Sequence, residues 1–310
     1  MSDPLSDVLN LVGVESSVYF QKDFRGSWCM DVRNTGYAQF HILVRGSANV
    51  THAGKVVPVS AGDIVLFPKG AAHFIGDTPE SISTPGIDVI NAISEGREPF
   101  TEGSNVTRMI CGHFEYDFAY SHPLFEELPE MVLIHSADLP ALDHLFGLIQ
   151  LIIRESASDA PGSDVVARRL SDGLLVTILR SFFEREKDRT GFYRGLSDKR
   201  IALALSAIHN DDNAQLTVDE LAVCAGMSRS SFSQRFKELV GQSAGSYATR
   251  WKLLKARHAI MSSDASIENI GLGNGYISAT AFSRAFNTTF GETPTQCRQK
   301  ARRVIDKENA

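Results

Sequence analysis

Residues 225–241 read AGMSRSSFSQRFKELVG, and residues 274–291 read NGYISATAFSRAFNTTFG. Ser278 lies 50 positions after Ser228, and the phenylalanines and the closing glycine repeat at the same offset. The second turn is one residue longer because it contains Ile277. Each stretch has the pattern of a helix end, a tight turn and a second helix, so we expect two helix-turn-helix units. Either stretch alone would equally suit an ordinary helical hairpin with a solvated polar face.

The residue types of each unit suit a turn followed by a half-buried helix. Gly226 and Gly275 can adopt the positive φ that closes a helix, and the serines that follow can cap the next helix. Phe232 and Phe236, like their counterparts 50 positions later, share one helix face at four-residue spacing and are expected to be buried. The opposite faces carry polar side chains that can hydrogen-bond to base edges.

A third helix is expected between the two units. Ser246 to Met261 has amphipathic spacing and no internal Gly or Pro. Such a helix spans about 24 Å, which would hold two recognition helices near the roughly 34 Å separation of successive major grooves. The sequence therefore predicts that one chain grips two groove segments of double-stranded DNA.

The second unit carries a longer signature. Its parts are Ile267–Gly271, Gly275–Ser278, Phe282–Phe286, Phe290–Pro294 and Arg298. With them, Leu216 to Arg298 resembles the DNA-binding domain of the AraC/XylS class of bacterial transcription regulators. There are departures from the family pattern: Gly271 and Gly273 replace helix formers, at about 1 kcal/mol each, and Cys297 replaces an aromatic residue.

The resemblance implies which side chains meet DNA. The positions matched to base reading are Ser230, Ser233, Gln234, Ala279, Thr280, Ser283 and Arg284. Phosphate contact needs charge and reach more than shape. The candidates for it are Arg229, Lys237, Arg250 and Lys255. For Arg284, an ion pair on the helix surface is the alternative.

Charge is distributed unevenly along the chain. The whole chain has a formal net charge of −6. From Ser197 onward there are 15 Lys and Arg against 11 Asp and Glu, a net of +4, so the preceding residues carry −10. Only the DNA-binding face needs to be basic. The asymmetry therefore agrees with a nucleic-acid partner, bound weakly by one monomer and with marked salt dependence.

The front of the chain has the pattern of a β-rich domain. Short apolar runs alternate with turn residues, which predicts a sandwich or small barrel. The expected strands cover residues 40–44, 48–50, 55–59, 63–67, 87–93 and 107–114. Amphipathic helices are expected at Leu142–Ile153 and Asp164–Glu186. The predicted fold class is α+β: a β-barrel with helices, followed by an all-α domain with two helix-turn-helix units.

Part of the strand region carries a second resemblance. Gly62, Pro68, Gly70 and His73 have the spacing of the second cupin motif, in which Gly and Pro form a hairpin and His projects into the barrel. The region is thus similar to the cupin-like sensor domains found ahead of some AraC-type regulators. The His-x-His and Glu of the first cupin motif are absent around residues 37–46. A facial metal site with open positions needs about three placed ligands, so we expect no enzyme.

A different metal site is conceivable in this region. Cys111 and His113 would point to one face of a strand. With His73, and with His41 or Cys29, they would complete a tetrahedral zinc set. The alternative is that Cys111 is a small buried hydrophobe and the histidines are hydrogen-bonded wall residues. Zinc in a structural or sensing role is the one cofactor that the sequence suggests.

Cysteine use and hydropathy bound the cellular setting. The four cysteines form no close pair, and Met1–Asn10 lacks the basic start and apolar core of a signal peptide. No apolar run approaches the roughly twenty residues that span a bilayer. We expect a cytoplasmic protein with no membrane partner. Cys224 and Cys297 are expected to fill the core, with a redox switch as the alternative.

These observations predict a sequence-specific transcription regulator. Residues 7–190 would form the effector and dimerisation domain, residues 191–197 a linker, and residues 198–302 the DNA-binding domain. A small molecule or another signal sensed in the front domain would control binding to promoter DNA. We expect a homodimer, with residues 164–186 either as its seam or as a cover for the barrel, and RNA polymerase is a candidate further partner. The alternatives are a zinc- or redox-sensing regulator and a cupin-type metalloenzyme fused to a DNA-binding domain.

Overall fold

The computed structural model describes residues 3–34, 36–77, 83–116, 122–137, 143–186, 189–211 and 216–308. Two compact units are formed. We call them the β unit, which comprises Val14–Tyr116 and Leu128–Glu186, and the helical unit, which comprises Met1–Gly13, Asp117–Glu127 and Lys187–Ala310. The helical unit therefore includes two segments from the front half of the chain.

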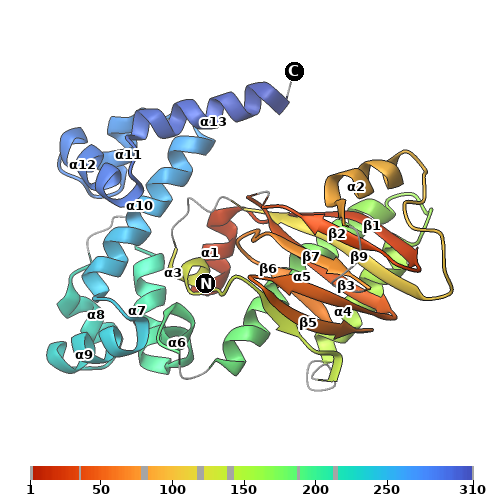
Figure 1. Ribbon diagram of the computed structural model, residues 1–310. Coiled ribbons are helices and arrows are strands. Elements are labelled where there is room, and N and C mark those ends of the chain that lie inside the picture. Colours follow the sequence, from red (N-terminus) through yellow and green to blue (C-terminus); the bar gives the residue numbers. More distant parts are fainter. Residues whose placement is uncertain are drawn as a thin grey trace. The chain divides into compact units, whose positions relative to one another are not determined.

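The β unit contains two five-stranded sheets (Figure 1). The first has the order β1 (Glu15–Arg25), β9 (Val106–Glu115), β3 (Ala38–Arg45), β6 (Ile64–Phe67) and β10 (Val132–Ile134). The second has the order β5 (Lys55–Ser60), β4 (Ser47–His52), β7 (His73–Gly76), β2 (Cys29–Val32) and β8 (Thr84–Pro85). Their pairings are antiparallel except for the parallel pair β2 and β8.

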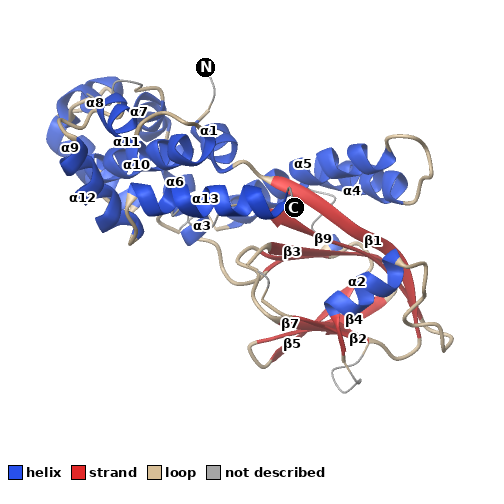
Figure 2. Ribbon diagram, turned by 90° about the horizontal axis from the view of Figure 1, so that it is seen from above, coloured by secondary structure: helices blue, strands red, loops and turns tan. Residues whose placement is uncertain are grey.

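The two sheets enclose an apolar core, and Figure 2 shows them facing each other. Trp28, Phe67 and Ile75 are fully buried in it. Helices α4 (Asp143–Ser156) and α5 (Ser163–Arg185) pack on each other and on β1. The predicted β-barrel with helices is therefore confirmed, because alternate strand residues supply one shared core.

One expected strand is wrong. Residues 87–93 belong to helix α2 (Gly86–Ser94), although their β-branched side chains suit a strand. Val89 and Ala92 are the buried residues of its inner face. The helix ends in left-handed Gly96, after which Arg97 N–H donates to the Ala92 carbonyl at 2.8 Å, as in a Schellman motif. Local capping and helical burial thus override the strand propensity.

Residues 164–186 were expected to form either a dimer seam or a cover for the barrel, and the packing of α5 matches the cover. Leu174 and Ile178 are fully buried within the β unit, where α5 contacts α4 and β1. The apolar stripe of this helix covers the barrel, which was the alternative reading. Phe146 and Leu151 of α4 are apolar side chains that stay exposed.

The helical unit contains the expected helix-turn-helix pairs. Their helices are α8 (Val218–Cys224) with α9 (Arg229–Val240), and α11 (Ile267–Gly273) with α12 (Ala279–Phe290). Helix α10 (Ala244–Ser262) joins the pairs, and α13 (Pro294–Glu308) packs on it. The remaining helices are α1 (Pro4–Val12), α3 (Pro123–Glu126), α6 (Phe192–Ser197) and α7 (Lys199–His209).

Residues 191–197, expected to be a linker, instead contribute to the core of the helical unit. Phe192, the first residue of α6, is fully buried and lies near Tyr247 and His209 with parallel rings. Helix α1 contacts α7 and α10, and α3 contacts α6. The glycines of this segment suggested flexibility, whereas Gly191 lies against the Glu127 carboxylate, which accepts a hydrogen bond from Phe192 N–H at 2.8 Å.

Candidate functional site

The two helix-turn-helix units have the same local construction. Gly226 (φ 61°) and Gly275 (φ 81°) lie in the left-handed region that the turn requires. The Ser228 hydroxyl accepts from Ser231 N–H, and the Ser278 hydroxyl accepts from Ala281 N–H, so each serine caps a recognition helix as predicted. Both recognition helices end in a left-handed glycine.

The predicted inner faces are buried. Phe232, Phe236, Phe282 and Phe286 are each 0 % exposed. Gly271, a departure from the family pattern, has a packing reason, because a Cβ there would come within 3.0–3.1 Å of the Phe282 side chain. The loss of helix propensity at this position is thus offset by close approach of α11 to α12.

The opposite faces carry the residues predicted to read bases. The exposed ones are Ser230, Ser233, Gln234, Thr280 and Arg284, while Ala279 and Ser283 are half-buried. Gln234 Nε2 donates to Glu238 Oε1 at 2.8 Å, within the same helix. In the described part of the chain, no ion pair engages Arg284, so its guanidinium points to solvent rather than to an acidic neighbour.

The candidates for phosphate contact differ in their surroundings. Lys237 is exposed on α9, and Arg229 is exposed but pairs with Asp219 at 2.9 Å. Lys255 is half-buried and donates to the Asp211 carbonyl at 3.2 Å. Arg250 pairs with Glu126 of α3.

Arg250 lies in a polar hollow within the helical unit. The hollow has a volume of about 740 Å³, and its lining is formed by Glu126, Gln242, Ser243, Gly245, Ser246, Thr249, Arg250 and Thr289. These residues come from α3, the start of α10 and the end of α12. A site with hydroxyls and one arginine suits a phosphate, and in this structure a carboxylate holds the arginine.

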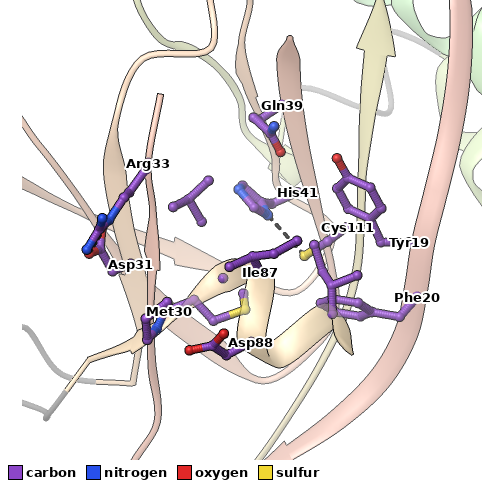
Figure 3. A pocket seen from close by; sticks show the side chains of 14 residues that line it. Tyr19, Phe20, Met30, Asp31, Arg33, Gln39, His41, Ile87, Asp88 and Cys111 are labelled. Carbon is purple, nitrogen blue, oxygen red and sulfur yellow. Dashed lines mark hydrogen bonds and ion pairs between the residues drawn. The ribbon is translucent and has the colours of Figure 1, made fainter. Parts of the chain in front are cut away.

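The β unit contains a cavity of about 460 Å³. Its lining is Tyr19, Phe20, Met30, Asp31, Val32, Arg33, Gln39, His41, Pro85, Gly86, Ile87, Asp88, Ile90 and Cys111 (Figure 3). The strands form one side of the cavity, and α2 forms the other together with Pro85, the residue before it. A volume of 300–1,000 Å³ with mostly apolar walls is typical of small-molecule sites.

A row of buried hydrogen bonds borders the cavity. His73 Nδ1–H donates to the Ala71 carbonyl at 2.8 Å, so Nε2 of its neutral ring accepts from His41 Nε2–H, also at 2.8 Å. His41 Nδ1 then accepts from the Cys111 thiol at 3.0 Å, which Figure 3 marks. Burial lowers the pKa of His73 to about 4, holds that of His41 well below its ordinary value and raises that of Cys111. All three groups are therefore uncharged.

This row does not form the zinc set considered from the sequence. His41 meets His73 and Cys111 with opposite ring nitrogens, so the three cannot converge on one ion. His113 lies apart, where it donates to Glu115 at 2.7 Å and stacks on Tyr19. Across the described ranges, no three His, Cys, Asp or Glu side chains are placed to ligate a metal. The structure matches the hydrogen-bonded wall.

Sequence reasoning named His41 and Cys111 but missed most of the cavity. Tyr19 and Phe20 lie on β1, for which no strand was predicted, at a bulge that shifts the register between Val18 and Phe20. Ile87 and Ile90 lie on the helix that was mistaken for a strand. Alternation of apolar residues in β1 was the available signal, and the bulge obscured it.

Comparisons with known proteins match the front and the rear of the chain to two different family models. Residues 3–184 match a family model described as cupin, and residues 221–300 match one described as helix-turn-helix domain. The chain belongs to the AraC-like transcription regulators that carry a cupin domain. Both resemblances drawn from the motifs are confirmed, and this regulator is a DNA-binding protein of the AraC type.

Full-length relatives of the regulator are themselves transcription regulators. It is 29 % identical to an AraC-like transcription regulator from Streptomyces lividans. The alignment spans 300 residues and covers 96 % of this chain and 98 % of the relative. It is also 29 % identical over 272 residues to the HTH-type transcriptional regulator MtrA from Neisseria gonorrhoeae, covering 84 % and 85 %. The names of these relatives describe transcription regulators and mention no enzymatic activity.

A solved DNA-binding domain is similar to the rear of the regulator. It belongs to AdpA, a global transcriptional factor, in a crystal structure with a target DNA. The match has 26 % identity and a TM-score of 0.32, and it covers 34 % of this chain and 96 % of that one. Separately, none of the helices in the described ranges combines the length and apolarity needed to cross a membrane.

Proposed function

We propose that this regulator recognises promoter DNA through the exposed faces of α9 and α12. The observation that carries the proposal is the repetition of one capped, polar-faced recognition helix at both ends of α10. Helix α10 has 19 residues, or about 28 Å of length. This length suits the placement of two recognition helices in successive major grooves of one duplex. Base contacts would come from the residues named above, with Gln234 and Arg284 as the longest reading side chains.

DNA-binding measurements test this interface. Arg284→Ala and Gln234→Ala should each weaken specific binding by about 1–3 kcal/mol without loss of fold. Arg235→Ala is the matched control, because Arg235 also lies on α9 but pairs with Asp198 away from the reading face. Normal affinity of both reading-face variants, or an equal loss in the control, would contradict the interface.

We further propose that a small molecule held in the cavity of the β unit controls DNA binding. The cavity has the size and apolar walls of a ligand site. A ligand shifts DNA binding only if it binds one arrangement of the protein more tightly than another. The test is whether a cavity ligand, found by calorimetry, changes the affinity for an operator fragment. A cavity ligand without any such effect would refute the control.

We also propose that the regulator acts as a cytoplasmic homodimer that engages RNA polymerase at its promoters. The buried Leu174 and Ile178 cannot form the dimer seam without unfolding. The exposed Phe146 and Leu151 of α4 support a seam on that helix instead. Sedimentation should then show that Leu151→Glu yields folded monomers, whereas Leu174→Glu should unfold the β unit. A dimer that survives Leu151→Glu would exclude this seam.

A further inference from the structure

Strands and α2 supply apolar side chains to the cavity of the β unit. Phe20, Met30, Val32, Ile87 and Ile90 are among its lining residues. Phe20 of β1 is buried, whereas Ile87 of α2 is 62 % exposed. Figure 3 shows both side chains among those that line the cavity. Ile87 extends the apolar part of the wall to the exposed rim, so a ligand that contacts it gains by being apolar.

The polar groups of the inner wall are already satisfied by one another. His41 uses both ring nitrogens, toward His73 and Cys111. Burial raises the pKa of Tyr19 to about 12, and a side-chain hydrogen bond with Gln39 opposes this rise in part. A ligand can share the remaining lone pairs of the tyrosine and the amide, but it meets no ionised group there.

The charged groups of the cavity lie at its rim and are predominantly acidic. Arg33, the cation among the described lining residues, is 80 % exposed in its side chain and lies 3.6 Å from Asp31. Asp88 adds a second rim carboxylate. An anionic ligand would therefore meet a paired arginine and an excess of negative charge.

We propose that the cavity binds an uncharged, predominantly apolar small molecule with one hydrogen-bonding group. The proposal rests on the control by a cavity ligand proposed above, and it names the class of that ligand. Burial of an ionised group without a partner costs several kcal/mol, and the inner wall offers no charged partner because the charged lining residues lie at the rim. A neutral hydroxyl can instead share the Tyr19 and Gln39 pair.

Calorimetry with three ligands of one shape tests the class. The ligands are para-propylphenol, para-propylbenzoate and para-propylbenzylamine, which are neutral, anionic and cationic at neutral pH. We expect the phenol to bind the full-length protein at least about tenfold more tightly than either ion, because the inner wall gives neither ion a counter-charge and the charged groups lie only at the rim. Equal or tighter binding of an ion, or no binding of the phenol, would overturn the proposal.

A rim variant provides a gain of function. Ile87→Lys places a cation beside the cavity at an exposed position, so the benzoate should gain roughly tenfold in affinity and the phenol should lose affinity. Ile87→Met is the matched control and should keep the phenol preference of the native protein. A benzoate affinity unchanged by the lysine would contradict the charge argument.

Operator binding, measured with each ligand bound, separates this proposal from the proposed function. If the phenol binds but operator affinity is unchanged, the proposed ligand class is supported and the proposed regulation of DNA binding by a cavity ligand is refuted. If the benzoate binds more tightly than the phenol and changes operator affinity, the proposed regulation is supported and the proposed ligand class is refuted.

Discussion

The core of the helical unit is organised around the buried hydroxyl of Tyr247, and the direction of each hydrogen bond there follows from its neighbour. Leu124 N–H donates to His122 Nδ1 at 3.1 Å, so the neutral ring carries its proton on Nε2 and donates to Tyr247 Oη at 3.2 Å. The tyrosine then donates to His209 Nε2 at 2.7 Å. The remaining His209 Nδ1–H faces Asp7 at 3.3 Å, without hydrogen-bond alignment.

Replacement of Tyr247 by phenylalanine should therefore destabilise the helical unit. The change leaves a buried donor on His122 and a buried acceptor on His209 without partners, and each unsatisfied group costs about 1–3 kcal/mol. Little apolar contact is lost, because the ring stays. We expect the free energy of unfolding to fall by about 2–6 kcal/mol.

Urea unfolding can isolate this effect, because the chain has two tryptophans, one in each unit. In a Trp28→Phe background, fluorescence reports on Trp251, whose ring stacks on His209 at 3.8 Å. Tyr276→Phe is the matched control, since the buried Tyr276 hydroxyl has no hydrogen-bond partner among the described residues and its removal should cost little. If Tyr247→Phe were no more destabilising than this control, the inferred network would be refuted.

Three further results are expected. Glu126→Gln should raise DNA affinity up to about fivefold, because the change releases Arg250 from its ion pair. The stability should change little, because an exposed ion pair contributes at most about 1 kcal/mol. Binding isotherms that do not shift would count against Arg250 as a phosphate contact. Acid should destabilise the helical unit. Burial lowers the pKa of His209 to about 3, below the value of 6.5 in the unfolded chain. The unfolded state therefore binds more protons, and the stability falls as the pH drops from 6.5 toward 3. Denaturation curves that coincide at pH 7 and pH 5 would exclude this. Gly273→Ala should stabilise the chain by about 1 kcal/mol, since a Cβ there meets open space. Gly271→Ala should instead lower the stability by about 1 kcal/mol, because its Cβ would crowd the Phe282 ring. Equal melting temperatures of the two variants would contradict this comparison.

The parts of the fold that could be predicted from sequence are those specified by neighbours in the chain. The helix-turn-helix units depend on a glycine, a capping serine and phenylalanines at four-residue spacing, all within about 20 residues. Both units therefore agree with the structure in their turns, caps and buried faces. In contrast, Ile87–Ile93 gives an ambiguous local signal, and β1 was obscured by its bulge at Tyr19.

The cavity could be predicted only in part, because its lining combines residues far apart in the sequence. The cupin motif located His73, but the relation of His41 to Cys111 depends on the register of β3 with β9. No local pattern indicates which strand faces which. The zinc set failed for the same reason: His113 shares a strand face with Cys111, yet its neighbours on other elements are Tyr19 and Tyr37.

The composition of the helical unit bears on whether the rear of the chain is self-sufficient. A fragment from Ser197 to Ala310 keeps both helix-turn-helix units, but it lacks α1, α3 and Phe192. The loss of α1, α3 and Phe192 would expose His209 and Tyr247, which are buried among these segments in the full chain. Because exposed apolar surface costs about 25 cal/mol per Å², we expect the fragment to bind operator DNA more weakly and to melt earlier than the full-length protein. A fragment of undiminished stability would show that the segments of the front half contribute nothing to the DNA-binding core.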